Sequence, residues 1–176
     1  MRTQHKRLGL LAIAALVAFG ASVAPALAAG MFTLVGLDSA TTFVAQSNPT
    51  EIAIVKAVPW TRAPTSSGDQ PELQFRQAKG RTMAFTLEFD GTDVHSAYVT
   101  RLVALALVMD PSGTGPQEKR RPTRVKVAAG AGAIAFEGVI ESIHTRYTEF
   151  LPDGTPVRAT CAVKLQEASR ATFVKP

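Results

Sequence analysis

The segment Pro152-Asp153-Gly154 constrains the fold of this 176-residue chain most strongly, because it predicts a tight turn between two strands. Proline presets φ, the aspartate side chain can bond its own backbone, and glycine accepts positive φ. Beyond the turn, apolar residues occupy every second position: Val157, Ala159, Cys161, Val163 and Leu165. Such alternation is typical of a strand with one buried face. With the β-rich run 136–144 before the turn, the pattern predicts one long hairpin.

Other segments predict further strands. The clearest is Thr82–Asp90, in which four apolar residues share one face: Met83, Phe85, Leu87 and Phe89. The β-prone runs 32–37, 41–45, 51–58 and 123–128 predict shorter strands. The segment 59–71 contains three prolines and a Ser-Ser-Gly-Asp stretch, so we expect an irregular, mobile loop there. The segment 117–122 predicts a charged loop, and Gly130-Ala-Gly132 predicts a tight turn between strands.

One segment has helical periodicity. Its apolar positions are Val94, Tyr98, Leu102, Leu105 and Met109. Thr92 or Asp93 is the expected N-cap, and Asp110-Pro111 ends the pattern. Several strands with one inserted helix predict a mainly β (α+β) fold, an antiparallel β-sandwich or barrel with one flanking α-helix.

The first 28 residues resemble a secretory signal peptide. A basic start precedes an apolar run from Leu8 to Val23, and Ala26-Leu-Ala28 has the small-x-small form that signal peptidase accepts. Translation from Met31 is the alternative, and a retained membrane anchor is a third reading, although the run is short for a span. In each case 31–176 forms a single domain, and we expect no membrane insertion of the mature chain.

Charge and cysteine content narrow the function further. The net charge of +5 falls to +2 without the first segment, since Arg2, Lys6 and Arg7 lie in it. Basic residues are not gathered with stacking aromatics, so no nucleic-acid partner is expected, although the cluster around Lys119 to Lys126 leaves that reading open. The single cysteine, Cys161, rules out an internal disulfide and is expected to be a buried structural thiol.

Candidate catalytic residues are few. Outside the signal-like segment the histidines are His95 and His144, and no metal-ligand spacing accompanies them. Glu137, Glu141 and Glu149 recur along one strand, but the outer two are too far apart for a glycosidase acid/base pair. We therefore expect no catalytic residue, no cofactor and no metal site; a hydrolase is the least favoured reading.

Several sequence blocks, taken in order, resemble one known family. These blocks are Asn48-Pro-Thr-Glu51, Leu73-Gln-Phe75, Arg81–Asp90, Asp93-Val94 with the helix that follows, Arg121-Pro-Thr-Arg-Val125, Phe136–Ser142 and Phe150–Ala159. The order and the amino-acid sequences of these blocks, over about residues 46–167, are similar to those of the tube-protein domain of contractile injection systems, the phage-tail-like particles of bacteria. Longer members of that family carry a LysM module; this chain ends at Pro176, so peptidoglycan binding is not expected.

The resemblance implies a non-enzymatic structural subunit. It would form a homo-hexameric ring in the inner tube or in its baseplate-proximal initiating ring, beside neighbouring tube, baseplate and spike proteins. Ring formation also removes exposed strand edges. Charged residues on the solvent-exposed face of the hairpin are the expected inter-subunit contacts: Glu137, Glu141, Glu149, Arg158 and Lys164.

Two readings of function and location follow. Translation from Met31 predicts cytoplasmic assembly into an injection particle. A real signal segment predicts a periplasmic or secreted protein, and the alternative function is then an exported envelope β-sandwich binding module without enzymatic activity.

Overall fold

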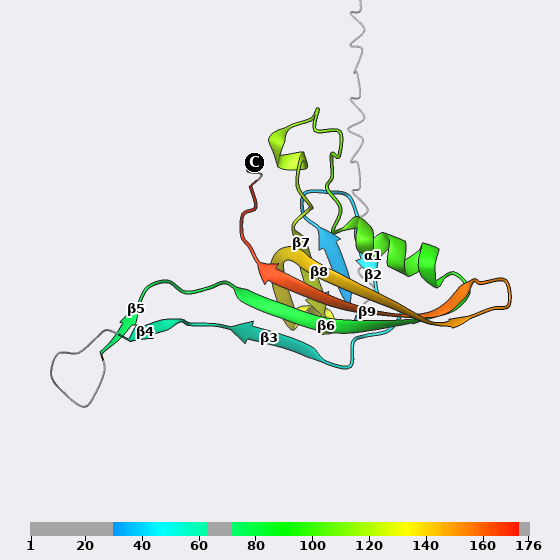
Figure 1. Cartoon of the computed structure of the whole chain (residues 1–176), viewed down its shortest axis with the longest axis horizontal. Coiled ribbons are helices and arrows are strands. Elements are labelled where there is room, and N and C mark those ends of the chain that lie inside the picture. Colours follow the sequence, from blue (N-terminus) through cyan, green and yellow to red (C-terminus); the bar gives the residue numbers. More distant parts are fainter. Residues whose placement is uncertain (1–29, 63–71, 173–176) are drawn as a thin grey trace, which may run out of the picture.

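The computed structural model describes residues 30–62 and 72–172, which form a curved antiparallel sheet flanked by a helix (Figure 1). The strands are β1 (Thr33–Gly36), β2 (Thr42–Val44), β3 (Ile52–Lys56), β4 (Trp60–Arg62), β5 (Leu73–Phe75), β6 (Arg81–Asp90), β7 (Val125–Ala129), β8 (Ile134–Phe150) and β9 (Pro156–Glu167). The helical segments are η1 (Val94–Val99, π), α1 (Thr100–Ala104), and the 3₁₀ turns η2 (Gln117–Lys119) and η3 (Gly130–Gly132).

Seven strands form one sheet in the order β2-β1-β7-β8-β9-β6-β3, with antiparallel pairing throughout. The sheet curls so that its two halves face each other. The ring of Phe32, beside β1, lies 4.5 Å from that of Phe85 on β6, and the ring of Phe43 on β2 lies 6.1 Å from that of Phe89. The predicted mainly β, α+β class is confirmed. The sheet is not closed into a barrel, because β2 and β3 remain its edges.

The core lies between the two halves of the sheet. The apolar face predicted for β6 is buried, with Phe85 the most exposed of its four residues at 4 %. On β9 the same is true of Ala159, Cys161, Val163 and Leu165. Burial of a large apolar side chain contributes about 1.5–3 kcal/mol to folding, so these two strands supply much of the stability.

The predicted hairpin is confirmed, with β8 and β9 joined by a turn at residues 151–155. Gly154 has a φ of +86°, and its N–H donates to the carbonyl of Leu151 over 2.9 Å. The side chain of Asp153 accepts from the N–H of Thr155 at 2.9 Å. Asp153 and Gly154 therefore act as the sequence predicted.

Strand β8 changes partners and phase along its length. Residues 134–138 pair with β7, whereas residues from Gly138 onward pair with β9. A bulge between Ile140 and Ser142 shifts the register by one residue. The inward positions are therefore even-numbered before Glu141 and odd-numbered after it, as at Phe136 and Ile143. The extra residue bends the strand and lets it serve both halves of the sheet.

The helix begins where predicted but ends earlier. Asp93 is its N-cap residue, without a side-chain hydrogen bond to the helix, and Val94, Leu102 and Leu105 are fully buried. Regular helix stops at Ala104 and does not continue to Met109. The reason is tertiary: the N–H of Met109 donates to the carbonyl of Arg121 at 3.2 Å, which draws this segment into an extended contact.

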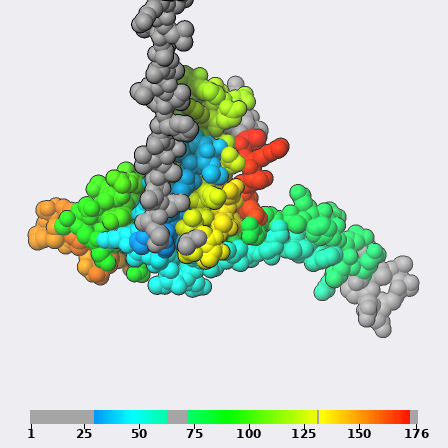
Figure 2. All heavy atoms as spheres, turned by 180° about the vertical axis from the view of Figure 1, so that it is seen from behind, coloured from blue at the N-terminus to red at the C-terminus, as the bar shows by residue number. Residues whose placement is uncertain are grey.

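The prediction of an irregular loop at 59–71 was wrong at its beginning. Trp60–Arg62 is strand β4, paired with β5, while residues 63–71 lie outside the described part. The rings of Trp60 and Phe75 lie opposite each other at 5.5 Å, and such a cross-strand aromatic pair stabilises a two-stranded ribbon. This ribbon projects from the body as an arm, defined here as residues 56–62 and 72–80 (Figure 2).

A half-buried ionic cluster ties three distant segments together. The carboxylate of Asp38, after β1, accepts from the guanidinium of Arg121 at 2.9 Å and from that of Arg124 at 2.9 Å. Arg124 also donates to the carbonyl of Ser169 at 2.7 Å, near the C-terminal end. The guanidinium of Arg124, assisted by Arg121, holds the pKa of Asp38 well below its usual range although burial opposes the shift.

We predict that Gly138→Ala destabilises the domain. A methyl group at Gly138 would overlap the backbone carbonyl of Gln166 on the neighbouring strand, and backbone cannot move aside as a flexible side chain can. Overpacking of this kind costs about 1–3 kcal/mol. Urea unfolding measures the loss, with Thr148→Ala on the exposed face of β8 as the control that leaves the midpoint unchanged. Equal midpoints for the two variants would contradict the close approach.

Asp38→Asn is predicted to lower the free energy of unfolding at neutral pH by about 1.5–3 kcal/mol, the contribution of a hydrogen bond to a charged group. The folded-state pKa of Asp38 lies below its unfolded value, so its contribution is complete above about pH 4 and is lost as pH falls further. The stability gap between wild type and variant should therefore narrow below pH 4. Unfolding curves at several pH values measure this gap, and Glu141→Gln is the exposed control; a constant gap contradicts the assignment.

Candidate functional site

The outer face of strands β3, β6, β9 and β8 carries the charged residues that the sequence singled out. Strand pairing places Arg158 on β9 opposite both Asp90 on β6 and Glu149 on β8. Its guanidinium contacts both carboxylates, with a distance of 2.6 Å to Asp90. Asp90 is the largest cause of the raised pKa of Arg158.

The other predicted contact residues lie further along the hairpin. Lys164 on β9 pairs with Glu141 on β8 at 3.1 Å. Glu137 lies apart from them, opposite Lys126 on β7. Four of the five residues are thus brought into ion pairs within the chain, and Asp90 joins them. The sequence could not indicate Asp90, because its neighbourhood depends on the register between β6 and β9.

These ion pairs are exposed to solvent. The side chains of Arg158, Glu149, Lys164 and Glu141 are 46–54 % exposed. Exposed pairs contribute little to stability because water and salt screen them. Their fixed geometry instead gives the outer face a defined pattern of charge.

A shallow groove of about 360 Å³ crosses the same face. Its floor contains the small residues Ala53, Ala84 and Ala162, with His144 and Lys164 beside them. Among the described residues no hydrogen bond connects Ser142 to His144, although both line the groove. A nucleophile and base in contact, which a hydrolytic site needs, are therefore not seen in this groove.

The side chains of His95, Tyr147 and Cys161 make contacts that hold the fold together. Nδ1 of His95 lies 2.6 Å from the hydroxyl of Tyr147, so the helix is held to β8. Burial raises the pKa of Tyr147 and that of the Cys161 thiol. Cys161 lies in the core and contacts Thr145 at 3.4 Å, which agrees with the predicted structural thiol.

The described residues, 30–62 and 72–172, contain no group of three or more histidine, cysteine, aspartate or glutamate side chains arranged to hold a metal ion. They also contain no helix that is both long and apolar enough to cross a membrane.

The two edges of the sheet, β2 and β3, are a further surface at which another chain could bind. Within residues 30–62 and 72–172, each edge strand presents backbone N–H and C=O groups that no further strand pairs with. Strand β3 has the sequence Ile-Ala-Ile-Val-Lys, in which Ile54 is 44 % and Val55 57 % exposed. Val44 on β2 is 41 % exposed. Monomeric proteins usually protect such edges with charges, prolines or bulges, and apart from Lys56 strand β3 has none.

Comparison with known proteins identifies the family of the chain. No curated protein matches the sequence. The model of the family described as contractile injection system tube protein matches residues 36–174, which includes all seven strands of the sheet except the first residues of β1. A tube is built by repeated contact between subunits, in agreement with the uncovered edges. The chain belongs to the contractile injection system tube protein family, and its role is structural.

Proposed function

We propose that the chain is a non-enzymatic subunit that forms a homo-hexameric ring, either in the inner tube or as its baseplate-proximal initiating ring. Its neighbours would be further tube subunits and the baseplate or spike proteins. The observation that carries this proposal is the curved sheet with two uncovered edges, β2 and β3. Membership of the tube-protein family supports it.

The two edges differ, so pairing one with the other gives a head-to-tail contact. Strand β2 belongs to one half of the curled sheet and β3 to the other. A head-to-tail interface generates a ring when the rotation closes and a filament when it does not. Pairing β2 of one copy with β3 of the next would therefore continue the sheet from subunit to subunit and leave no edge exposed.

The charged outer face adds specificity to this arrangement. Arg158 and Lys164 already have partners within the chain, yet about half of each side chain is exposed. A neighbouring subunit can therefore supply a second partner without breaking the first. The proposed inter-subunit contacts are therefore Glu137, Glu141, Glu149, Arg158 and Lys164. Glu137 is also exposed and lies opposite Lys126 on the adjacent strand β7.

We predict that Val55→Lys or Val44→Lys impairs ring formation and leaves the monomer folded. Both side chains are more than 40 % exposed, so neither packs in the core, and an edge lysine opposes strand addition. Sedimentation velocity should show the wild-type ring replaced by a smaller species in each variant. The Val55→Lys variant retains an intact β2 edge and the Val44→Lys variant an intact β3 edge. An equimolar mixture of the two should therefore form a heterodimer.

The control for the edge variants is Gln117→Lys, at an exposed position in η2, which belongs to neither edge strand. It adds the same charge and should assemble as wild type. Rings that persist in both edge variants would contradict the edge contact. A wild-type chain that remains monomeric at high concentration would contradict the ring itself.

Where the subunit acts depends on its true N-terminus. Phe32 is the first core residue, is fully buried, and its N–H donates to Asn48 at 2.7 Å. A chain beginning at Ala29 or at Met31 therefore contains the whole described core. We propose cytoplasmic assembly for a chain that starts at Met31, and an exported envelope binding module for one cleaved after Ala28.

Mass spectrometry of the native N-terminal peptide separates the two locations. We expect a peptide beginning at Met31 in sedimented particles, because contractile particles require folded subunits at the site of assembly. A peptide beginning at Ala29 in a periplasmic extract, and absent from particles, would contradict the tube function and favour the envelope module.

A further inference from the structure

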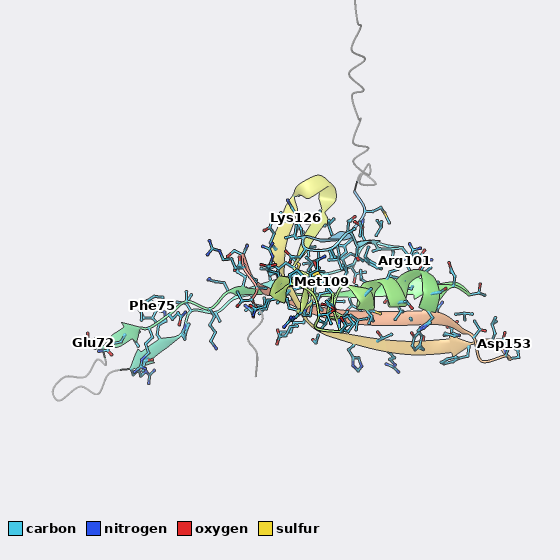
Figure 3. The ribbon with its side chains drawn as sticks, turned by 90° about the horizontal axis from the view of Figure 1, so that it is seen from above. Glu72, Phe75, Arg101, Met109, Lys126 and Asp153 are labelled. Carbon is cyan, nitrogen blue, oxygen red and sulfur yellow. The ribbon has the colours of Figure 1, made fainter. Side chains whose placement is uncertain are left out.

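The molecule is elongated, and its two ends carry opposite charge. Glu72 and Phe75 lie at one end, on the arm, and Asp153 lies at the other, at the turn between β8 and β9 (Figure 3). Strand β6 connects the two ends, since it begins at Arg81 beside the arm and finishes at Asp90. Its ten residues separate them by about 30 Å at the usual rise of a strand.

The arm is basic and apolar. Its described residues include four basic side chains and one acidic one: Lys56, Arg62, Arg76, Lys79 and Glu72. Four large apolar side chains on it are 44–57 % exposed: Val58, Trp60, Leu73 and Phe75. At its base an open groove of about 540 Å³ is lined by Arg76 and Lys79, with no acidic residue. Exposed aromatic and apolar groups beside one sign of charge are typical of a contact surface.

The opposite end, called here the hairpin end, is residues 88–93 and 146–160. It contains five acidic side chains and two basic ones: Glu88, Asp90, Asp93, Glu149, Asp153, Arg146 and Arg158. Arg158 is already shared between Asp90 and Glu149. Glu88, Asp93 and Asp153 form no ion pair with other described residues. The apolar residues Phe150 and Leu151 are 58 % and 40 % exposed among these carboxylates.

We propose that the basic arm of one copy docks on the acidic hairpin end of another copy of this chain. This inference rests on the proposed assembly function and adds a contact distinct from the sheet edges. Each end offers what the other lacks: the arm carries basic groups around exposed aromatics, and the hairpin end carries carboxylates around Phe150 and Leu151. Complementary charge steers the two surfaces together and excludes like ends, while the apolar groups supply buried area.

A second copy fits these observations better than another occupant of the arm. Basic and aromatic side chains together also suit a single-stranded nucleic acid. However, the complementary acidic and apolar patch is present on the same chain, at the far end of the long axis, as a head-to-tail contact requires. The experiment must therefore distinguish binding of nucleic acid by the arm from docking of a second copy.

Charge exchange between the two ends tests the contact. The arm variant is Arg76→Glu with Lys79→Glu, and the hairpin-end variant is Glu88→Lys with Asp93→Lys; all four side chains are exposed. Each variant alone should raise the concentration needed for assembly about tenfold or more, because it places like charges opposite each other. Carrying all four substitutions in one chain, or mixing the two variants, should restore assembly. Sedimentation velocity of the full chain measures the effect.

The controls separate this contact from general charge effects and from failure of the ring. Lys119→Glu with Arg170→Glu makes the same charge change at exposed positions outside both ends and should assemble as wild type. Wild-type assembly should weaken from about 0.05 M to about 0.5 M salt and should resist nuclease. If charge exchange between the two ends fails to restore assembly while the wild-type chain forms rings, the contact between arm and hairpin end is wrong and the proposed ring is unaffected. If nuclease abolishes assembly, the arm binds nucleic acid and the proposed contact between copies is wrong. If the wild-type chain never assembles, both the proposed ring and the proposed contact are contradicted.

Discussion

The curvature of strand β8 is the constraint on which the rest of the structure depends. Its first part pairs with β7 and its remainder with β9, so this one strand joins the two halves of the sheet. Gly138 permits the close approach of Gln166, and the bulge before Ser142 changes which side chains face inward. The two halves can therefore enclose Phe32, Phe43 and Phe89 in a common core. A flat sheet with the same residues would leave those aromatics exposed to water.

This curvature also leaves the sheet unclosed, which connects the fold to its function. A sheet that curls without closing keeps two edges, and each edge needs another strand, a covering segment or protective charges. In the proposed ring, other copies of the same chain would satisfy that need. The stability of the single domain instead comes from the core and from the Asp38 cluster, which joins the β1–β2 turn to the start of β7 and the C-terminal segment.

The outer surface divides into parts with different physical character. The ion pairs of Arg158 and Lys164 are formed within the chain and are screened by solvent, so they define a pattern of charge more than they stabilise the domain. Among the described residues, the exposed aromatic side chains Trp60, Phe75 and Phe150 lie on the arm and the hairpin end, beside charged groups that form no ion pair. The proposed assembly contacts therefore lie outside the core and the Asp38 cluster, so variants can test them without removing the interactions that fold the domain.

The sequence by itself determined the local features: the turn at Asp153-Gly154, the alternating faces of β6 and β9, the helix start at Asp93, and the family to which the blocks belong. These depend on neighbours within a few residues, where turn chemistry and periodicity act. Tertiary structure alone decided that Asp90 meets Arg158, that Trp60 begins a strand, that the helix stops before Met109, and that the sheet remains unclosed. Each of these depends on pairing between segments that lie far apart in sequence, and strand alternation is the same whichever partner and register a strand takes.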